Sequence, residues 1–332
     1  ISAFTILGVA ALVIAIFTLL ATGRSGVDNY LSSLGNSTLT YQSVASSYSG
    51  PTFDFGATIV FVPFFALFVY PWVNAAPAVA SEIKGKSTLK WNVPVSALIA
   101  MILMTSAFGA MYYAGGFAFT NAALASTTLV VNYSFNFWTL AMGATSNVLL
   151  AWIIGIGWVL WVINIIAYLV VVEGRYLLAQ AFDRFLPARV AYVSPRYGSP
   201  VVAHIVDFIF AAVLVAGASF LYGTFVSLYG TIVGPMIYFM FVGISAIIYA
   251  MKNEKGRTKA TLIVCGALSA LVFLWLTLEF LINYAIWGGN WFAYGYLVVT
   301  AVGGSIIYLA SKTYNSRKGI DISLAFKQIP PE

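Results

Sequence analysis

Long apolar runs dominate the pattern of this 332-residue chain. Each is about eighteen residues or longer, enough to cross a hydrocarbon core of about 30 Å as an α-helix rising about 1.5 Å per residue. Runs such as residues 149–172 do not alternate polar with apolar positions, as the strands of a transmembrane β-barrel would. The pattern predicts eight transmembrane helices, at residues 1–21, 57–80, 94–114, 147–173, 201–221, 226–250, 259–284 and 292–311.

Composition agrees with this pattern. Hydrophobic residues make up 61% of the chain and charged residues only 8%, roughly a third of the charged share of a soluble domain. A soluble fold cannot solvate itself with so few charges, and the apolar runs are too many and too long for a signal peptide. We therefore expect an all-α integral membrane protein, with one transmembrane domain over residues 1–312 and a tail over residues 313–332.

The positions of the basic residues predict the topology. If the helices alternate in direction, all sixteen Lys and Arg residues except Arg24 fall in one set of loops and the tail. Basic residues collect on the cytoplasmic side of membrane proteins, so the net charge of +6 indicates cytoplasmic loops rather than a nucleic-acid partner. We expect a multi-pass plasma-membrane protein with a cytoplasmic C-terminus, and with loops 22–56 and 115–146 outside. The cytoplasmic set is Lys84, Lys86, Lys90, Arg175, Arg184, Arg189, Arg196, Lys252, Lys255, Arg257, Lys259, Lys312, Arg317, Lys318 and Lys327.

The second predicted span contains two prolines, Pro71 and Pro77, near its middle. Each proline removes a backbone donor and displaces the preceding turn, which frees carbonyl groups around residues 67–73. At membrane depth, such a break persists where it lines a cavity or packs against protein. The pattern predicts a substrate-facing interruption at residues 68–74; the alternative is a helix that is merely kinked, since proline is common in transmembrane helices.

Other spans carry weaker signals of the same kind. In the fourth span, Gly155 and Gly157 permit close approach of a neighbouring backbone, and Trp158, Trp161 and Asn164 are candidates for a cavity wall. The alternative is helix packing with one satisfied amide. Residues 230–235 of the sixth span read Gly-Thr-Ile-Val-Gly-Pro and present the same choice.

Ionisable groups inside spans are few, and each lies near a membrane interface. His204 and Asp207 are three residues apart on one helical face and are candidates for a pair, and Glu279 lies near the outer end of the seventh span. A structural role is favoured for all three.

Several chemistries are excluded by what the sequence contains. Cys265 is the only cysteine and His204 the only histidine, so the chain offers neither a thiolate cluster nor a pair of haem ligands. The sequence has no P-loop, nucleophile elbow or HExxH motif. We expect no enzyme activity, no cofactor and no metal site.

Two stretches resemble the amino acid, polyamine and organocation superfamily of permeases. Glu82-Ile83-Lys84 matches the cytoplasmic end of the family's sixth helix, which aligns Tyr70 with its aromatic position and Asn74 with its first glutamate, whereas Trp72 replaces its glycine. More specific is the loop after the fourth span, which is similar to the loop after the family's eighth helix. It comprises Gly174-Arg175, a short amphipathic helix, Leu186-Pro187 and Gly198-Ser199-Pro200.

The resemblance implies a fold and a mode of action. The eight spans resemble helices five to twelve of a five-plus-five inverted repeat with two extra C-terminal helices, so about four further helices are expected before Ile1. Substrate is held between broken helices one and six in such transporters. Residues 68–74 would then contact the amino group and side chain of the substrate.

We interpret the chain as a secondary transporter for amino acids or related small organic cations that works by alternating access. Its expected partners are an amino acid or amine and the lipid bilayer. The alternative is a transport-inactive scaffold with other membrane subunits, which Trp72 favours slightly. The predicted substrate-binding residues are Phe68, Tyr70, Pro71, Trp72, Asn74, Trp158, Trp161 and Asn164.

Overall fold

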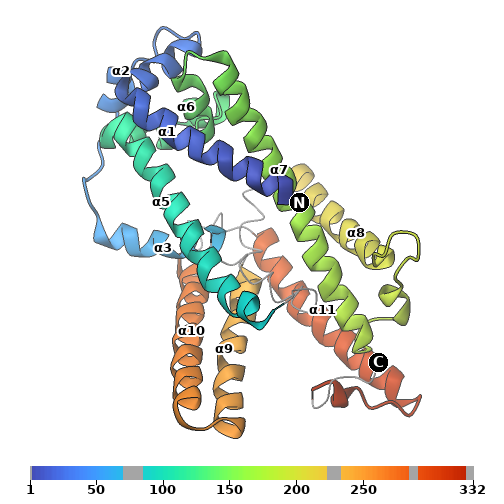
Figure 1. The fold of residues 1–332 in the computed structure, drawn as a ribbon. Helices are drawn as coiled ribbons and strands as arrows, with labels where there is room; N and C mark the ends of the chain where they lie inside the picture. The colour runs from blue at the N-terminus through green and yellow to red at the C-terminus, as the bar shows by residue number, and fades with distance from the viewer. Residues whose placement is uncertain (1, 70–84, 223–232, 284–290, 327–332) are drawn as a thin grey trace. The chain divides into compact units, whose positions relative to one another are not determined.

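The computed structural model describes residues 2–69, 85–222, 233–283 and 291–326. Within these ranges every regular element is a helix, and the only β pairing is an isolated bridge between Ser194 and Ser199. Seven described helices are long and apolar enough to cross a membrane (Figure 1). They are α1 (Ser2–Ser33), α5 (Lys86–Ala125), α7 (Val148–Phe182), α8 (Val201–Gly217) with the π-helical turn Ala218–Tyr222, α9 (Val233–Asn253), α10 (Gly256–Ile282) and α11 (Trp291–Ser316). The prediction of an all-α integral membrane fold is confirmed.

Each of these seven helices corresponds to a predicted span. The second predicted span begins as α3 (Phe55–Val69), and its remaining residues, with Pro71 and Pro77, lie outside the described residues. In the sixth span, residues 230–232 are likewise outside that part, while Gly234 and Pro235 occupy the first turn of α9. Proline is compatible with a first turn because its missing N–H group has no partner there in any case.

The chain divides into two compact units, residues 1–54 with 80–171 and residues 55–79 with 172–332. In the first unit, α1 packs against α5 and α6 (Phe137–Ala144), and α5 also contacts α2 (Tyr41–Ser46). Five core side chains, Leu19, Val27, Phe119, Leu129 and Leu140, are fully buried.

Most of the expected loops 22–56 and 115–146 are helical, so the predicted helix ends are wrong there. α1 continues to residue 33 through a kink at Gly23 (φ 51°), and α5 continues to residue 125 through a kink at Gly116 (φ 69°). Glycine adopts such positive φ values at little cost, which lets each helix turn and continue. Tyr41 stacks on Phe119, with ring centroids 5.0 Å apart, and this contact packs α2 against α5.

The second unit contains an α9–α10 hairpin, drawn in orange (Figure 1). It also contains the C-terminal end of α7, the helix α8 and the helix α11. The short amphipathic helix expected after the fourth span is not separate, because α7 runs without a break to Phe182. α8 begins at Val201, directly after Pro200, where the fifth predicted span begins.

Candidate substrate site

The main predicted site cannot be placed in the structure. Tyr70, Pro71, Trp72 and Asn74 lie outside the described residues, as does the side chain of Phe68, whose backbone belongs to α3. The assignment of residues 68–74 to the substrate stays a prediction.

The three candidates on α7 are described, and two of them lie against α1. The indole of Trp161 covers Gly8, and Gly157 lies against the methyl group of Ala11. Residues 157, 161 and 164 follow one face of α7 while residues 11, 8 and 5 follow one face of α1, so the two helices run antiparallel here. We call these six positions the α1–α7 seam.

A polar contact closes the seam. The hydroxyl group of Thr5 donates to Oδ1 of Asn164 over 3.2 Å, and both side chains are partly buried. Among the described residues the Nδ2 group of Asn164 has no hydrogen-bond acceptor. Leaving an amide donor without a partner at membrane depth is costly. Asn164 is therefore only half satisfied by α1 and retains two N–H donors for another group.

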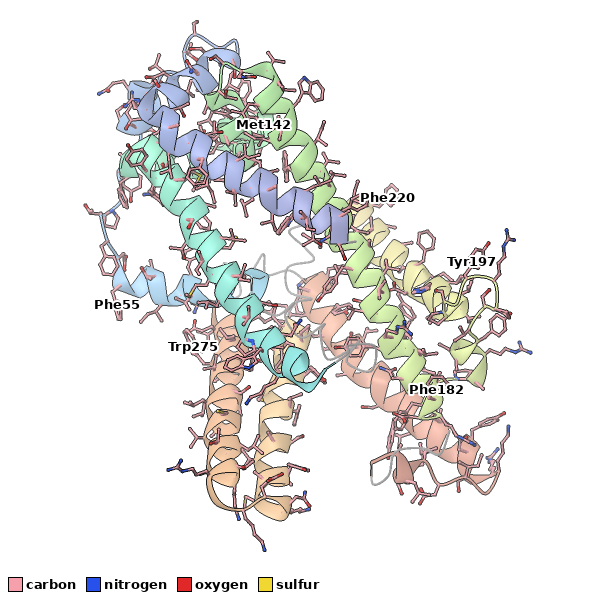
Figure 2. All side chains as sticks on the ribbon, in the orientation of Figure 1. Phe55, Met142, Phe182, Tyr197, Phe220 and Trp275 are labelled. Carbon is pink, nitrogen blue, oxygen red and sulfur yellow. The ribbon has the colours of Figure 1, made fainter. Side chains whose placement is uncertain are left out.

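Trp158 points elsewhere. Its ring stacks on Trp138 of α6, with centroids 6.3 Å apart and planes 8° from parallel. It also lines a pocket of about 550 Å³ between the end of α6 and the start of α7, beside Met142, which Figure 2 labels. The residues that line this pocket carry no charge, so it offers no ionic partner for the ammonium and carboxylate groups of an amino acid. The structure thus brings Trp161 and Asn164 together and leaves Trp158 apart.

The expected pair of His204 and Asp207 does not form. Nε2 of His204 lies 2.9 Å from Oγ of Ser199, and the imidazole rests against Gly174 of α7. Asp207 interacts instead with the carboxyl group of Glu173, also on α7. A spacing of three residues would allow His204 and Asp207 to pair within α8. Because Gly174 has no side chain, α7 packs close to α8 there, and His204 and Asp207 both contact α7 instead.

Glu279 has partners on its own helix. Its carboxylate accepts hydrogen bonds from Nε1 of Trp275 over 3.2 Å and from Nδ2 of Asn283 over 2.5 Å. These two contacts account for a structural role, as the sequence favours.

Sequence reasoning missed Thr5 and Glu173. Thr5 is one of the few polar residues in the first apolar run, and Glu173 ends the fourth run. Thr5 shares its helical face with the small residues Gly8 and Ala11, whereas Glu173 is followed directly by Gly174. Neither becomes a candidate until the neighbouring helix is known.

The comparisons with known proteins agree with the helical architecture. The family model described as amino acid permease matches residues 2–314, nearly the whole chain. No curated protein and no solved structure matches the chain significantly. The extent of the family match shows that the chain belongs to the amino acid permease family, within the amino acid, polyamine and organocation superfamily.

Proposed function

We propose that this permease moves amino acids or related small organic cations as a secondary transporter that works by alternating access. Membership of the family supports transport of a small molecule across a bilayer in general, and its members are typically transporters rather than enzymes. The observation that carries the finer proposal is the half-satisfied amide of Asn164 in the α1–α7 seam.

Asn164 suits a substrate because its free Nδ2 donors can bind a carboxylate or carbonyl oxygen. Ligand sites in transporters lie at membrane depth and are built from a few polar groups on otherwise apolar helices. Trp161 would form the apolar wall beside this amide. Residues 68–74 stay the proposed main site, and the role of Trp158 is to hold α7 against α6.

Uptake into proteoliposomes tests the proposal. With radiolabelled amino acids supplied as a mixture, we expect Asn164→Leu to lower the initial rate about tenfold or more, since a lost hydrogen bond to a charged group costs about 1.5–3 kcal/mol. Thr5→Val removes the hydroxyl donor of the seam but leaves the amide, and its rate should stay within about threefold of wild type. Parallel losses in the two variants would show that Asn164 acts only by packing. No uptake by the wild-type protein would favour the scaffold alternative.

The proposed topology places residues 22–56 and 115–146 outside, with residues 174–200 and the tail (313–332) in the cytoplasm. It rests on the partition of basic residues. Labelling of whole cells with a membrane-impermeant thiol reagent checks it, in a Cys265→Ala background because Cys265 is exposed. Ser37 is exposed and suits the outer side. On the inner side Ser194 is only 9% exposed, so Tyr197, which is 67% exposed and labelled in Figure 2, is the better position.

We expect Ser37→Cys to be labelled on intact cells and Tyr197→Cys only after the cells are opened. The opposite result would invert the topology. Labelling of both on intact cells would contradict the partition of charge itself.

A further inference from the structure

A pocket of about 830 Å³ lies in the second unit, where the C-terminal ends of α7 and α11 meet. Its volume falls within the range of about 300–1,000 Å³ typical of ligand pockets. None of the residues discussed for the substrate takes part in it. Phe182, Arg184, Ser311, Tyr314, Asn315 and Lys318 are among its lining residues.

The walls of this pocket are fixed by hydrogen bonds between the two helix ends. Asn315 is only 7% exposed, and its Nδ2 group donates to the carbonyl oxygen of Arg184 over 3.1 Å and to that of Ser311 over 2.9 Å. The hydroxyl group of Ser311 donates to the carbonyl oxygen of Phe185 over 2.6 Å. These hydrogen bonds join the ends of α7 and α11 and fix the backbone that bounds the pocket. The pocket is therefore already formed before a ligand binds.

The charge of the pocket is positive. Arg184 and Lys318 line it and are both exposed, while none of its lining residues is acidic. Nζ of Lys318 donates to the hydroxyl oxygen of Tyr314 over 2.7 Å, which keeps the ammonium group at the rim with further N–H donors. The flanking segments 181–196 and 310–321 hold six basic residues against two acidic ones. Phosphate is the anion that such a pair of cations binds well.

Most of the other lining residues are apolar, and the pocket continues along the membrane-spanning part of α11. Phe182 and Tyr314 are 59% and 60% exposed, and Figure 2 shows Phe182 at the end of α7. A second, mostly apolar groove of about 460 Å³ shares Ala310 and Tyr314 with the pocket and extends to Leu309 and Ile306, with Thr313 and Arg317 also in its wall. A cationic rim that continues into an apolar groove matches a molecule with an anionic head and a hydrocarbon chain.

We propose that this pocket binds an anionic phospholipid, with its phosphate on Arg184 and Lys318 and an acyl chain along the α11 groove. The position suits such a ligand, because basic pockets at the cytoplasmic ends of transmembrane helices recognise anionic headgroups. A soluble phosphate would use the two cations but not the groove. The proposal is independent of the transported substrate.

Native mass spectrometry of the delipidated protein in detergent tests this site. We expect phosphatidylglycerol to bind more tightly than phosphatidylcholine with the same acyl chains. Arg184→Gln with Lys318→Gln should weaken phosphatidylglycerol binding by about 30-fold, from about fivefold for each cation near an anionic headgroup. The matched control is Lys252→Gln with Arg257→Gln, which removes two exposed charges at the α9–α10 connection, and its binding should match wild type.

Three results would overturn the proposal. Equal binding of phosphatidylcholine would show that the headgroup charge is not recognised. Equal losses in the two double variants would show a general effect of surface charge. Competition by glycerol phosphate as strong as that by the intact lipid would assign the pocket to a soluble anion and leave the groove without a role.

Discussion

Gly157→Ala is expected to lower both the thermal stability of the permease and its rate of uptake. A Cβ atom at Gly157 would overlap the methyl group of Ala11 and lie 3.6 Å from the carbonyl oxygen of Leu7. The two helices would have to separate, and overpacking of this kind costs about 1–3 kcal/mol. Separation would also displace Asn164, which belongs to the same seam and whose Nδ2 group is the proposed donor to the substrate. Thermal unfolding in detergent, followed by tryptophan fluorescence, measures the first effect and proteoliposome uptake the second.

A control and a rescue make this result specific to the seam. Gly109 lies in α5 of the same unit with nothing within 4 Å of its added Cβ, so Gly109→Ala should leave stability unchanged or slightly raised. Combining Gly157→Ala with Ala11→Gly moves the methyl group from one helix to the other. The double variant should recover most of the lost stability. A Gly157→Ala protein as stable as Gly109→Ala would show that α1 and α7 are not in contact at this point.

The sequence predicts where the membrane-spanning helices lie because length and hydrophobicity alone set that property. It fails at the helix ends near Gly23 and Gly116, where composition indicates loops. Ser, Thr and Asn in those segments are instead used as helix caps, as at Thr40 and Asn136, whose side chains accept hydrogen bonds from the first turns of α2 and α6. Composition cannot separate a loop from a capped short helix.

Candidate polar residues were predicted less well than the helices. The sequence marked Asn164 as an amide within a span and suggested that His204 and Asp207 pair on one helical face, but spacing within one helix does not show contacts to a neighbouring helix. The partner of Asn164 is Thr5 on α1, and the partner of Asp207 is Glu173 on α7. The first contact lies beside the close approach of the helices at Gly157, and the second beside the one at Gly174. Glycines in apolar runs were thus the most informative part of the pattern, because they mark where two helices meet.

In the α9–α10 hairpin two helices meet backbone to backbone, at Gly243 and Gly266. A Cβ atom at Gly243 would lie 2.7 Å from the carbonyl oxygen of Gly266 and 2.8 Å from the backbone nitrogen of Ala270. A Cβ atom at Gly266 would lie 2.7 Å from the carbonyl oxygen of Gly243. Small residues four apart, such as Gly266 and Ala270, permit this approach between membrane helices.

Gly243→Ala is therefore expected to destabilise the protein more than Gly157→Ala does, at or above the upper end of about 1–3 kcal/mol. The obstacle at Gly157 is a side-chain methyl group, whereas at Gly243 it is backbone that cannot rotate away, and no rescue exists because the facing residue is already glycine. Gly303→Ala in α11 is the control, since its added Cβ meets nothing within 4 Å. We expect the midpoint of thermal unfolding to fall in the order Gly303→Ala, Gly157→Ala, Gly243→Ala. If Gly243→Ala unfolds at the temperature of Gly303→Ala, α9 and α10 do not approach at these glycines, and the hairpin must be held by its larger side chains instead.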